Sequence, residues 1–146
     1  MIWAQRGDPN FRVLLAGLSS AIWGEPREVA GDTILALTDG EDVIGIVAFH
    51  NYDAKAGVME LSAAAETPRW LTRRDLHAVF SCVFNQCGCP AAILRCAPED
   101  LRMARIATAY GFKRYEIPRL RGRDESEIVY VLGDDQWRAN GFHKEY

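Results

Sequence analysis

Two β-rich runs flank one helix-forming stretch in the middle of the chain, and this order limits the fold more than any other feature. The runs are residues 58–65, VMELSAAA, and residues 91–96, AAILRC. The stretch between them repeats apolar side chains at helical spacing, at Leu76, Val79, Phe80, Val83 and Cys87, before Gly88 and Pro90. Strands joined through a helix lie parallel, with a right-handed crossover. The sequence therefore predicts one parallel strand pair.

The runs before this crossover predict an antiparallel meander. Residues 33–38, 43–49 and 58–65 are rich in β-forming side chains and are separated by polar turns, the first of which contains Asp39 and Gly40. Neighbouring strands joined by short turns pair antiparallel. The predicted sheet is therefore mixed.

Two further helices and two further strands complete the predicted order. Residues 10–26 carry an amphipathic stripe, and another helix starts at residues 98–100 and closes at Gly111. Strands follow at residues 112–117 and 127–132. The two helical stripes are Phe11, Leu14, Leu15, Leu18 and Ile22, and Met103, Ile106, Ala107 and Tyr110. This order predicts an α/β fold, more closely an α+β mixed sheet, with helices on both faces.

Length and charge limit the size and the partners of the protein. With 146 residues, of which 49% are hydrophobic, we expect a single domain over residues 1–146 with a substantial core. The net charge of -3 provides no overall basic field and does not favour binding to nucleic acid or anionic lipid. No apolar run reaches the roughly 18 residues of a membrane span, and the first residues lack the pattern of a secretory leader. We therefore expect a cytoplasmic protein without a membrane span.

The cysteines indicate neither a disulfide framework nor a metal site. Four of them, Cys82, Cys87, Cys89 and Cys96, are too few for a disulfide-rich scaffold. The spacing of Cys87 and Cys89 would let two thiolates share one ion, but structural zinc usually requires C-x2-C pairs or histidine partners, and the histidines are scattered. We therefore expect free thiols that pack as small apolar side chains, and no bound metal.

The start of the central helix is a candidate binding site. Residues 72–75, Thr-Arg-Arg-Asp, match a capping box, in which the threonine and the acid satisfy backbone N–H groups. Free N–H groups and the helix dipole attract anions there, and Arg69, Arg73 and Arg74 add positive charge. A helix start after a parallel strand is also a usual place for a ligand crevice. Two interpretations stay open: a phosphate-binding turn, or a capped helix start on a basic surface.

Long segments of the chain resemble one enzyme family. The segments VMELSAAAETPRWLTRRDLHAVFSCVF and EDLRMARIATAYGFKRYEIPRLRGRDESEIVYVL, with the element order, are similar to the GNAT superfamily of acetyl-CoA-dependent N-acetyltransferases. The P-x-W-x-T-R segment is similar to a phage and prophage subset of that family, and A-Y-G-F, residues 109–112, is similar to its C-terminal pattern. The resemblance covers roughly residues 33–137. It implies a GNAT-like fold with a splayed parallel strand pair, acetyl-CoA as co-substrate and a primary amine as acceptor.

The resemblance also implies where acetyl-CoA would lie. The runs at residues 58–65 and 91–96 would part, the pantetheine would follow residues 62–65, and the pyrophosphate would lie on the amides of residues 71–74. The implied cofactor-binding residues are Ser62, Ala63, Ala64, Ala65, Trp70, Leu71, Thr72, Arg73, Arg74, Asp100 and Arg105.

The chain departs from the family pattern at the cofactor positions. Residues 70–72 stand where most relatives have glycines that let the phosphates approach. Relatives often carry an asparagine at the position of Asp100, where an acid facing the phosphates would repel them unless Arg102 or Arg105 offsets its charge. Asp100 also suits the helix dipole.

Acetyl transfer to an amine needs a base for the amine and an acid for the leaving thiolate. Glu60 is the predicted base, because a carboxylate on a half-buried strand beside the cleft can accept the proton directly or through a water. Strand parity leaves a surface-facing glutamate open. Relatives often place the acid on the helix where this chain has Ala107 and Thr108. Tyr110 is the nearest phenol and the candidate acid, with core packing of Tyr110 and protonation by solvent as alternatives.

The acceptor and the assembly stay open. Candidate wall residues of the acceptor site are Trp3, Trp23, His50, Asn51 and Tyr52, although such aromatic residues more often belong to cores or interfaces. The alternative to an enzyme is a catalytically inactive GNAT-fold interaction protein, for example a phage factor that binds a host protein. A homodimer is a further expectation.

Overall fold

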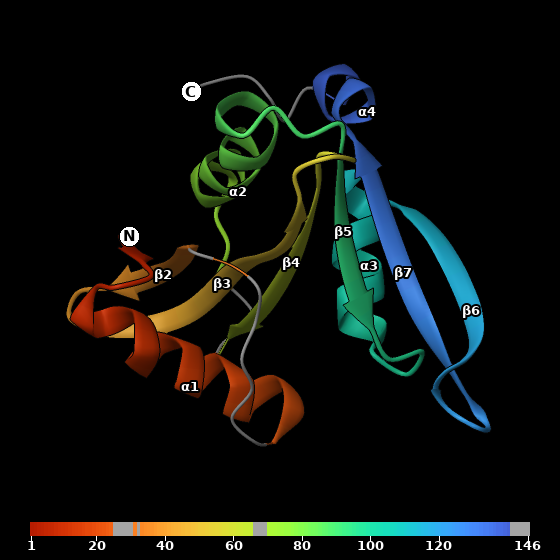
Figure 1. Ribbon diagram of the computed structural model, residues 1–146, viewed down its shortest axis with the longest axis horizontal. Helices are drawn as coiled ribbons and strands as arrows, with labels where there is room; N and C mark the ends of the chain where they lie inside the picture. The colour runs from red at the N-terminus through yellow and green to blue at the C-terminus, as the bar shows by residue number, and fades with distance from the viewer. Residues whose placement is uncertain (25–30, 32, 66–69, 141–146) are drawn as a thin grey trace.

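The computed structural model describes residues 1–24, 31, 33–65 and 70–140. These residues form a seven-stranded sheet between two layers of helices (Figure 1). The strands are β1 (Ile2–Gln5), β2 (Thr33–Asp39), β3 (Asp42–Asp53), β4 (Val58–Ala65), β5 (Ala91–Cys96), β6 (Lys113–Gly122) and β7 (Glu125–Gly133). The helices are α1 (Pro9–Trp23), α2 (Arg73–Ser81), the π-helical η1 (Cys82–Gln86), α3 (Leu101–Tyr110) and α4 (Asp134–Ala139). None of the described helices is long and apolar enough to cross a membrane.

The strands pair in the order β1-β2-β3-β4-β5-β7-β6. β4 and β5 run parallel, and every other neighbouring pair in this order is antiparallel. This confirms the mixed sheet, the meander and the parallel pair, because the length and kind of each connection set the direction of the strands that it joins.

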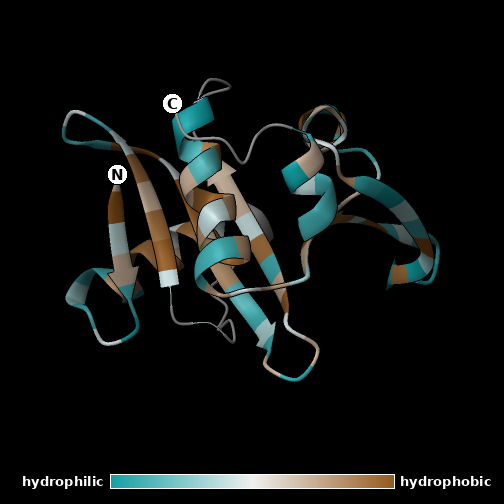
Figure 2. Ribbon diagram, turned by 90° about the horizontal axis from the view of Figure 1, so that it is seen from above, coloured by the Kyte–Doolittle hydropathy of each residue, from teal (hydrophilic) through white to brown (hydrophobic). Residues whose placement is uncertain are grey.

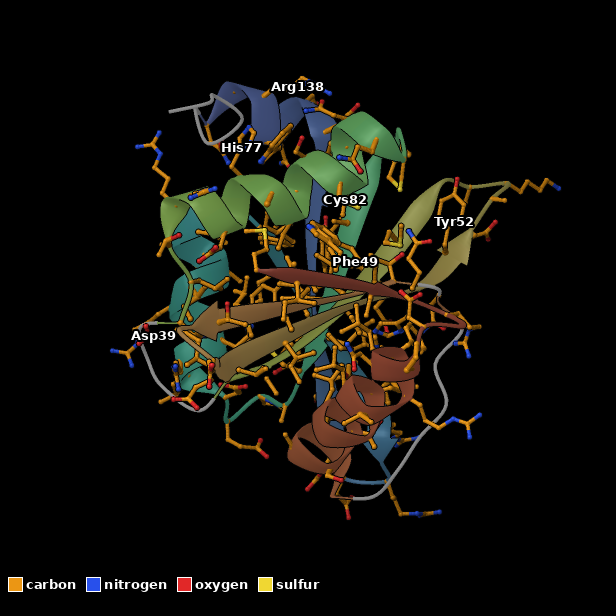
Figure 3. The ribbon with its side chains drawn as sticks, turned by 90° about the vertical axis from the view of Figure 1, so that its left-hand side faces the viewer. Asp39, Phe49, Tyr52, His77, Cys82 and Arg138 are labelled. Atoms are coloured by element: carbon orange, nitrogen blue, oxygen red, sulfur yellow. The ribbon has the colours of Figure 1, made fainter. Side chains whose placement is uncertain are left out.

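Two apolar clusters hold the helices on opposite faces of the sheet. On one face, Phe11 and Leu18 of α1 pack with Ile34 of β2. On the other face, Phe80 of α2 stacks on Tyr110 of α3, with ring centroids 4.7 Å apart. Figure 3 shows α1 below the sheet and α2 and α4 above it, and Figure 2 shows apolar strands between the helices. The expectation of helices on both faces is confirmed.

Two elements, β1 and α4, are absent from the predicted order, and β6 runs farther than the predicted strand. β1 has four residues and exists as an edge strand paired with β2. α4, DDQWRA, has no apolar period, but its single tryptophan, Trp137, is fully buried. Local patterns cannot predict elements of this kind, because long-range pairing and packing create them.

The prediction that Cys87 continues the buried stripe of the central helix is wrong. After α2 the chain widens into η1, where Cys87 N–H donates to the carbonyl of Cys82 over 2.9 Å. A π-helical turn holds more residues than an α-helical turn, so the side chains after it point in new directions. Phe84 is buried as a result, and Cys87 is exposed.

Candidate functional site

The parallel strands β4 and β5 part after three residue pairs. Residues 59–61 of β4 lie opposite residues 92–94 of β5, and within the described ranges their pairing stops there. β4 continues to Ala65 while paired on its other side with β3. The predicted splay is therefore confirmed, and the backbone groups that residues 62–65 direct toward β5 have no strand partner in the part of the chain that the structure describes.

A cavity of about 890 Å³ opens between the parted strands. Residues 60–65 of β4 and 94–96 of β5 form its floor, and Val79 of α2 with Met103 and Ile106 of α3 contribute to its walls. Cavities of roughly 300–1,000 Å³ are typical of small-molecule sites. The fold therefore places an open binding site where the sheet divides.

The residues predicted to guide a pantetheine chain all line this cavity, namely Ser62, Ala63, Ala64 and Ala65. Their side chains alternate between the two apolar clusters, with Ala63 and Ala65 on the α2 side and Ala64 on the α1 side. Because all four side chains are small, a ligand can approach the backbone of β4 closely. Their role in binding stays a prediction.

Glu60 lies where the two strands begin to part. Its side chain is 15% exposed and lines the cavity, so it does not face bulk solvent. One carboxylate oxygen, Oε2, lies 3.3 Å from His50 Nε2 and accepts a hydrogen bond from Asn51 Nδ2 over 3.1 Å. The other oxygen lies 3.9 Å from an Arg95 guanidinium nitrogen. The carboxylate is thus held in one orientation at the fork.

A β-bulge brings Asn51 onto Glu60. The register of β3 and β4 shifts between His50 and Asp53, and Asn51 adopts a left-handed backbone with φ of 51°. Asparagine tolerates this region better than most residues, and bulges commonly re-aim a side chain beside a functional site. The bulge therefore gives Asn51 its bond to Glu60, where the sequence suggested only a wall position.

His50 is the buried neighbour of Glu60. It is 2% exposed, and its Nε2 lies 2.7 Å from Ser62 Oγ. Burial lowers the pKa of His50, and the Glu60 carboxylate partly opposes that shift. Nδ1 has no hydrogen-bond partner in the described part of the chain, so the neutral ring is best satisfied with its proton on Nε2. Counting back from the hairpin turn in regular register would place Asn51 opposite Glu60, and the bulge shifts the pairing so that His50 takes this position, which the sequence did not indicate.

His50 is expected to make the free energy of unfolding depend on pH. The unfolded ring has its usual pKa of 6.5, and the folded ring has a lower one, so the unfolded state takes up the proton first as the pH falls. Its stabilising contribution is complete above pH 6.5 and is lost below it, by up to about 1.4 kcal/mol per pH unit. Urea denaturation at several pH values measures this slope, and His50→Gln should reduce it. Equal slopes in both proteins would assign the pH dependence to other groups.

A chain of ion pairs continues from Glu60 across β5, β7 and β6. Arg95 Nε lies 3.6 Å from one oxygen of Glu127, and an Arg121 guanidinium nitrogen lies 3.2 Å from the other. Glu127 is buried, and all of these side chains line the cavity. No local pattern in the sequence indicated this network, because its members come from strands that become neighbours only in the sheet. The arginines compensate the buried carboxylate.

The capping box predicted at residues 72–75 is present at the start of α2. Thr72 Oγ1 accepts a hydrogen bond from Asp75 N–H over 3.2 Å, and the Asp75 carboxylate accepts one from Thr72 N–H over 3.0 Å. The carboxylate of Asp75 therefore lies at the helix start, where a phosphate was predicted. The structure confirms the cap, and anion binding there stays a prediction.

The residues predicted to hold the phosphates fall into two groups. Trp70 and Leu71 line the cavity, and the ring of Trp70 packs against Gly45 of β3, where a larger residue would collide with it. Thr72, Arg73 and Arg74 are exposed and do not line it. Residues 66–69, with Arg69, lie outside the described residues, as does the side chain of Trp23.

At the start of α3, Asp100 caps the helix and faces the cavity. Its carboxylate accepts a hydrogen bond from Met103 N–H over 3.1 Å. Of the two arginines considered as its partners, Arg102 lines the cavity. Arg105 lies instead along a depression on another side of α3, next to Leu101. The exposed side chain of Arg105 therefore does not line the cavity, and its predicted contact with the cofactor stays a prediction.

Tyr110 reaches the cavity wall from the core. It is 4% exposed, and its hydroxyl accepts a hydrogen bond from Trp137 Nε1 over 2.9 Å. Stacking on Phe80 fixes its ring. These contacts agree with the alternative in which Tyr110 packs in the core. Its role as an acid stays a prediction.

The cavity also contains a thiol that is kept protonated. Burial, with help from Asp100 and Glu127, raises the pKa of Cys96 to about 11. A neutral thiol is a poor nucleophile, so Cys96 would not compete for an activated acyl group near neutral pH. All four cysteines are free, and no cluster of His, Cys, Asp and Glu side chains within the described ranges is arranged to hold a metal.

No protein-family model and no curated protein matches the sequence. The fold does match solved structures. Mutant forms of the spermidine/spermine N-acetyltransferase SpeG from Vibrio cholerae align with a TM-score of 0.73 at 11% identity, over 96% of this chain and 98% of that chain. A GCN5-related N-acetyltransferase from Brucella melitensis aligns with a TM-score of 0.63 at 19% identity, over 75% of this chain and 53% of that one. At these identities the likeness establishes the fold alone.

Other matches are to longer proteins. The chain spans 59% and 57% of the length of two further solved acetyltransferase structures. Together with the seven-stranded mixed sheet, these structural matches confirm the fold class predicted from the sequence.

Proposed function

We propose that the protein is an acetyl-CoA-dependent N-acetyltransferase that acts on a primary amine. The observation that carries this proposal is the fork between β4 and β5, where the backbone of residues 62–65 has, among the described residues, no strand partner on its β5 side and borders a cavity of about 890 Å³. The pantetheine amides would pair with these backbone groups, as an added strand does at a sheet edge. The fold that the chain shares with acetyltransferases supports the same assignment.

Each step of the transfer has a candidate group at the fork. Glu60 would accept the proton of the amine, and the amine nitrogen would then attack the thioester carbonyl, forming the amide bond as the C–S bond breaks. Asn51 and the neutral ring of His50 would hold the carboxylate in position. The leaving thiolate would take its proton from solvent or from Tyr110. Spermidine and a lysine-containing peptide are suitable first acceptors, the former because SpeG is a structural neighbour.

Acetyl-CoA is expected to bind with a dissociation constant in the micromolar range, on the order of 10–100 µM, which calorimetry can measure. The exposed Arg74 at the start of α2 should contribute through its charge, so Arg74→Ala should weaken binding about threefold to tenfold. The matched control is Arg12→Ala, an exposed arginine on α1 away from the cavity, with binding unchanged. The absence of heat at protein concentrations above about 100 µM would count against the proposal.

One observation favours the second candidate, an interaction protein without activity. The Asp75 carboxylate at the start of α2 is bonded to Thr72 N–H, one of the amides predicted to receive phosphate. A stoichiometric partner captured from a host lysate, by a protein that ignores acetyl-CoA, would support this candidate. The resemblance to phage-type relatives and the cytoplasmic location stay predictions.

A further inference from the structure

Within the described residues, β6 is an edge strand with one unpaired side. It is the last strand in the described sheet, where its strand partner is β7, and all of its ten residues are exposed. In Figures 1 and 2 the β6–β7 hairpin extends from the sheet on the side away from α1 and α2. A strand edge of this kind presents a row of N–H and C=O groups that can pair with another strand.

The regular part of β6 ends in the middle of the strand. Lys113 to Ile117 pair in continuous register with β7, and the register shifts between Ile117 and Gly122. Pro118 lies just after the regular part and has no N–H to donate, and Arg119 adopts a left-handed backbone with φ of 64°. The segment available for further pairing is therefore residues 113–117.

We infer that two copies of this chain pair through their β6 strands, antiparallel and with the two-fold axis at Tyr115. In this register Arg114 of one protomer lies opposite Glu116 of the partner subunit, and Glu116 lies opposite Arg114 of the partner subunit. Opposite charges across an antiparallel pair are stabilising, and like charges are destabilising. The order Arg114-Tyr115-Glu116 is thus complementary to itself, which favours a second copy over another occupant.

The apolar side chains of β6 fit the same arrangement. Tyr115 is 45% exposed and Ile117 is 38% exposed, and they share one face of the strand while Arg114 and Glu116 share the other. At the two-fold axis Tyr115 would meet Tyr115 of the partner subunit, and on each side of this pair an Ile117 would lie opposite a Lys113 of the other protomer. Dimerisation would therefore cover exposed apolar surface and leave both cavities open.

The size of the paired segment determines how tightly the two copies are expected to bind each other. Five residue pairs bury less than the roughly 1,200–2,000 Å² of a standard stable interface. We therefore expect a dimer that dissociates on dilution, with a dissociation constant on the order of 10 µM. This inference does not rest on the proposed enzymatic function, and its test requires no acetyl-CoA.

Sedimentation of the full chain, from about 1 µM to several hundred micromolar, tests the pairing. Wild type should shift from monomer to dimer. Glu116→Arg and Arg114→Glu each place like charges in opposite positions, so each alone should weaken the dimer about tenfold or more. An equimolar mixture of the two variants restores opposite charges in every pair and should sediment as a heterodimer. Arg123→Glu, an exposed charge reversal beyond the paired segment, is the matched control and should leave the dimer unchanged.

The outcomes separate this pairing from other assemblies. A wild-type protein that stays monomeric at every concentration would overturn the inference, as would single variants that dimerise like wild type. A mixture that stays monomeric while wild type dimerises would exclude the register centred on Tyr115. Arg114 also lies opposite the buried Tyr130 of β7, so if Arg114→Glu does not fold, Glu116→Arg alone still tests whether the β6 charges stabilise the dimer.

Discussion

Glu60→Gln is expected to slow acetyl transfer by about a hundredfold or more, the usual contribution of a general base. Glutamine keeps the shape of the side chain and its place beside Asn51 and His50, but it cannot accept the proton of the amine. Acetyl-CoA binding should stay within about twofold of wild type. The proposed role of Glu60 is to take a proton from the amine during the transfer, and an interaction that acts only in the transition state can be lost without weakening substrate binding. The release of free coenzyme A, measured with the acceptor that supports turnover, gives the rate, and calorimetry gives the affinity.

The control for this substitution is Glu41→Gln. Glu41 is an exposed carboxylate in the turn between β2 and β3, away from the cavity, and its substitution should change neither rate nor affinity. If Glu60→Gln turns over like wild type, Glu60 is not the base. If it binds acetyl-CoA much more weakly, its carboxylate acts in binding, and the ion pair with Arg95 becomes the first place to examine.

Trp137→Ala is expected to lower the free energy of unfolding by about 3–5 kcal/mol, the usual cost of removing a large buried aromatic side chain. The ring of Trp137 is fully buried, with its centroid 5.2 Å from that of Phe84, and its Nε1 donates to the hydroxyl of Tyr110. Because Trp137 is the single buried residue of α4, its removal takes away the anchor of that helix. Urea denaturation measures the change.

Two milder substitutions separate ring packing from the hydrogen bond. Trp137→Phe keeps an aromatic ring and loses the N–H donor, so it should cost less than Trp137→Ala. Tyr110→Phe leaves the buried Trp137 N–H without its acceptor, a loss of about 1–3 kcal/mol. A Trp137→Ala protein as stable as wild type would mean that α4 is not docked against Phe84 and Tyr110 in solution.

The sequence predicts most of the fold because its signals are local. The helix between residues 58–65 and 91–96 requires a parallel pair, and turns such as Asp39-Gly40 require antiparallel pairs. The capping box at Thr72 and the helix end at Gly111 can also be predicted from the sequence, since each depends on residues a few positions apart. β1 and α4 cannot be predicted in this way, because neither has a periodic hydrophobic pattern of its own.

Only part of the candidate site can be predicted from short stretches of the sequence. Glu60 and the small residues that follow it could be singled out from one strand, but whether Glu60 faces the cavity depends on how β4 sits in the sheet. Arg95, Glu127 and Arg121 come from three strands and form a network only after the sheet has assembled. No spacing in the chain could have grouped them.

The sequence by itself determined the order of helices and strands from α1 to β7, apart from η1, and the parallel pair at the centre, because hydrophobic period and connection type act over short distances along the chain. Only the tertiary structure decided where β4 and β5 part, that His50 and Asn51 meet Glu60, and that Arg105 lies off the cavity. These features depend on register, bulge and helix rotation, and a change of one residue in any of them redirects a side chain to another surface.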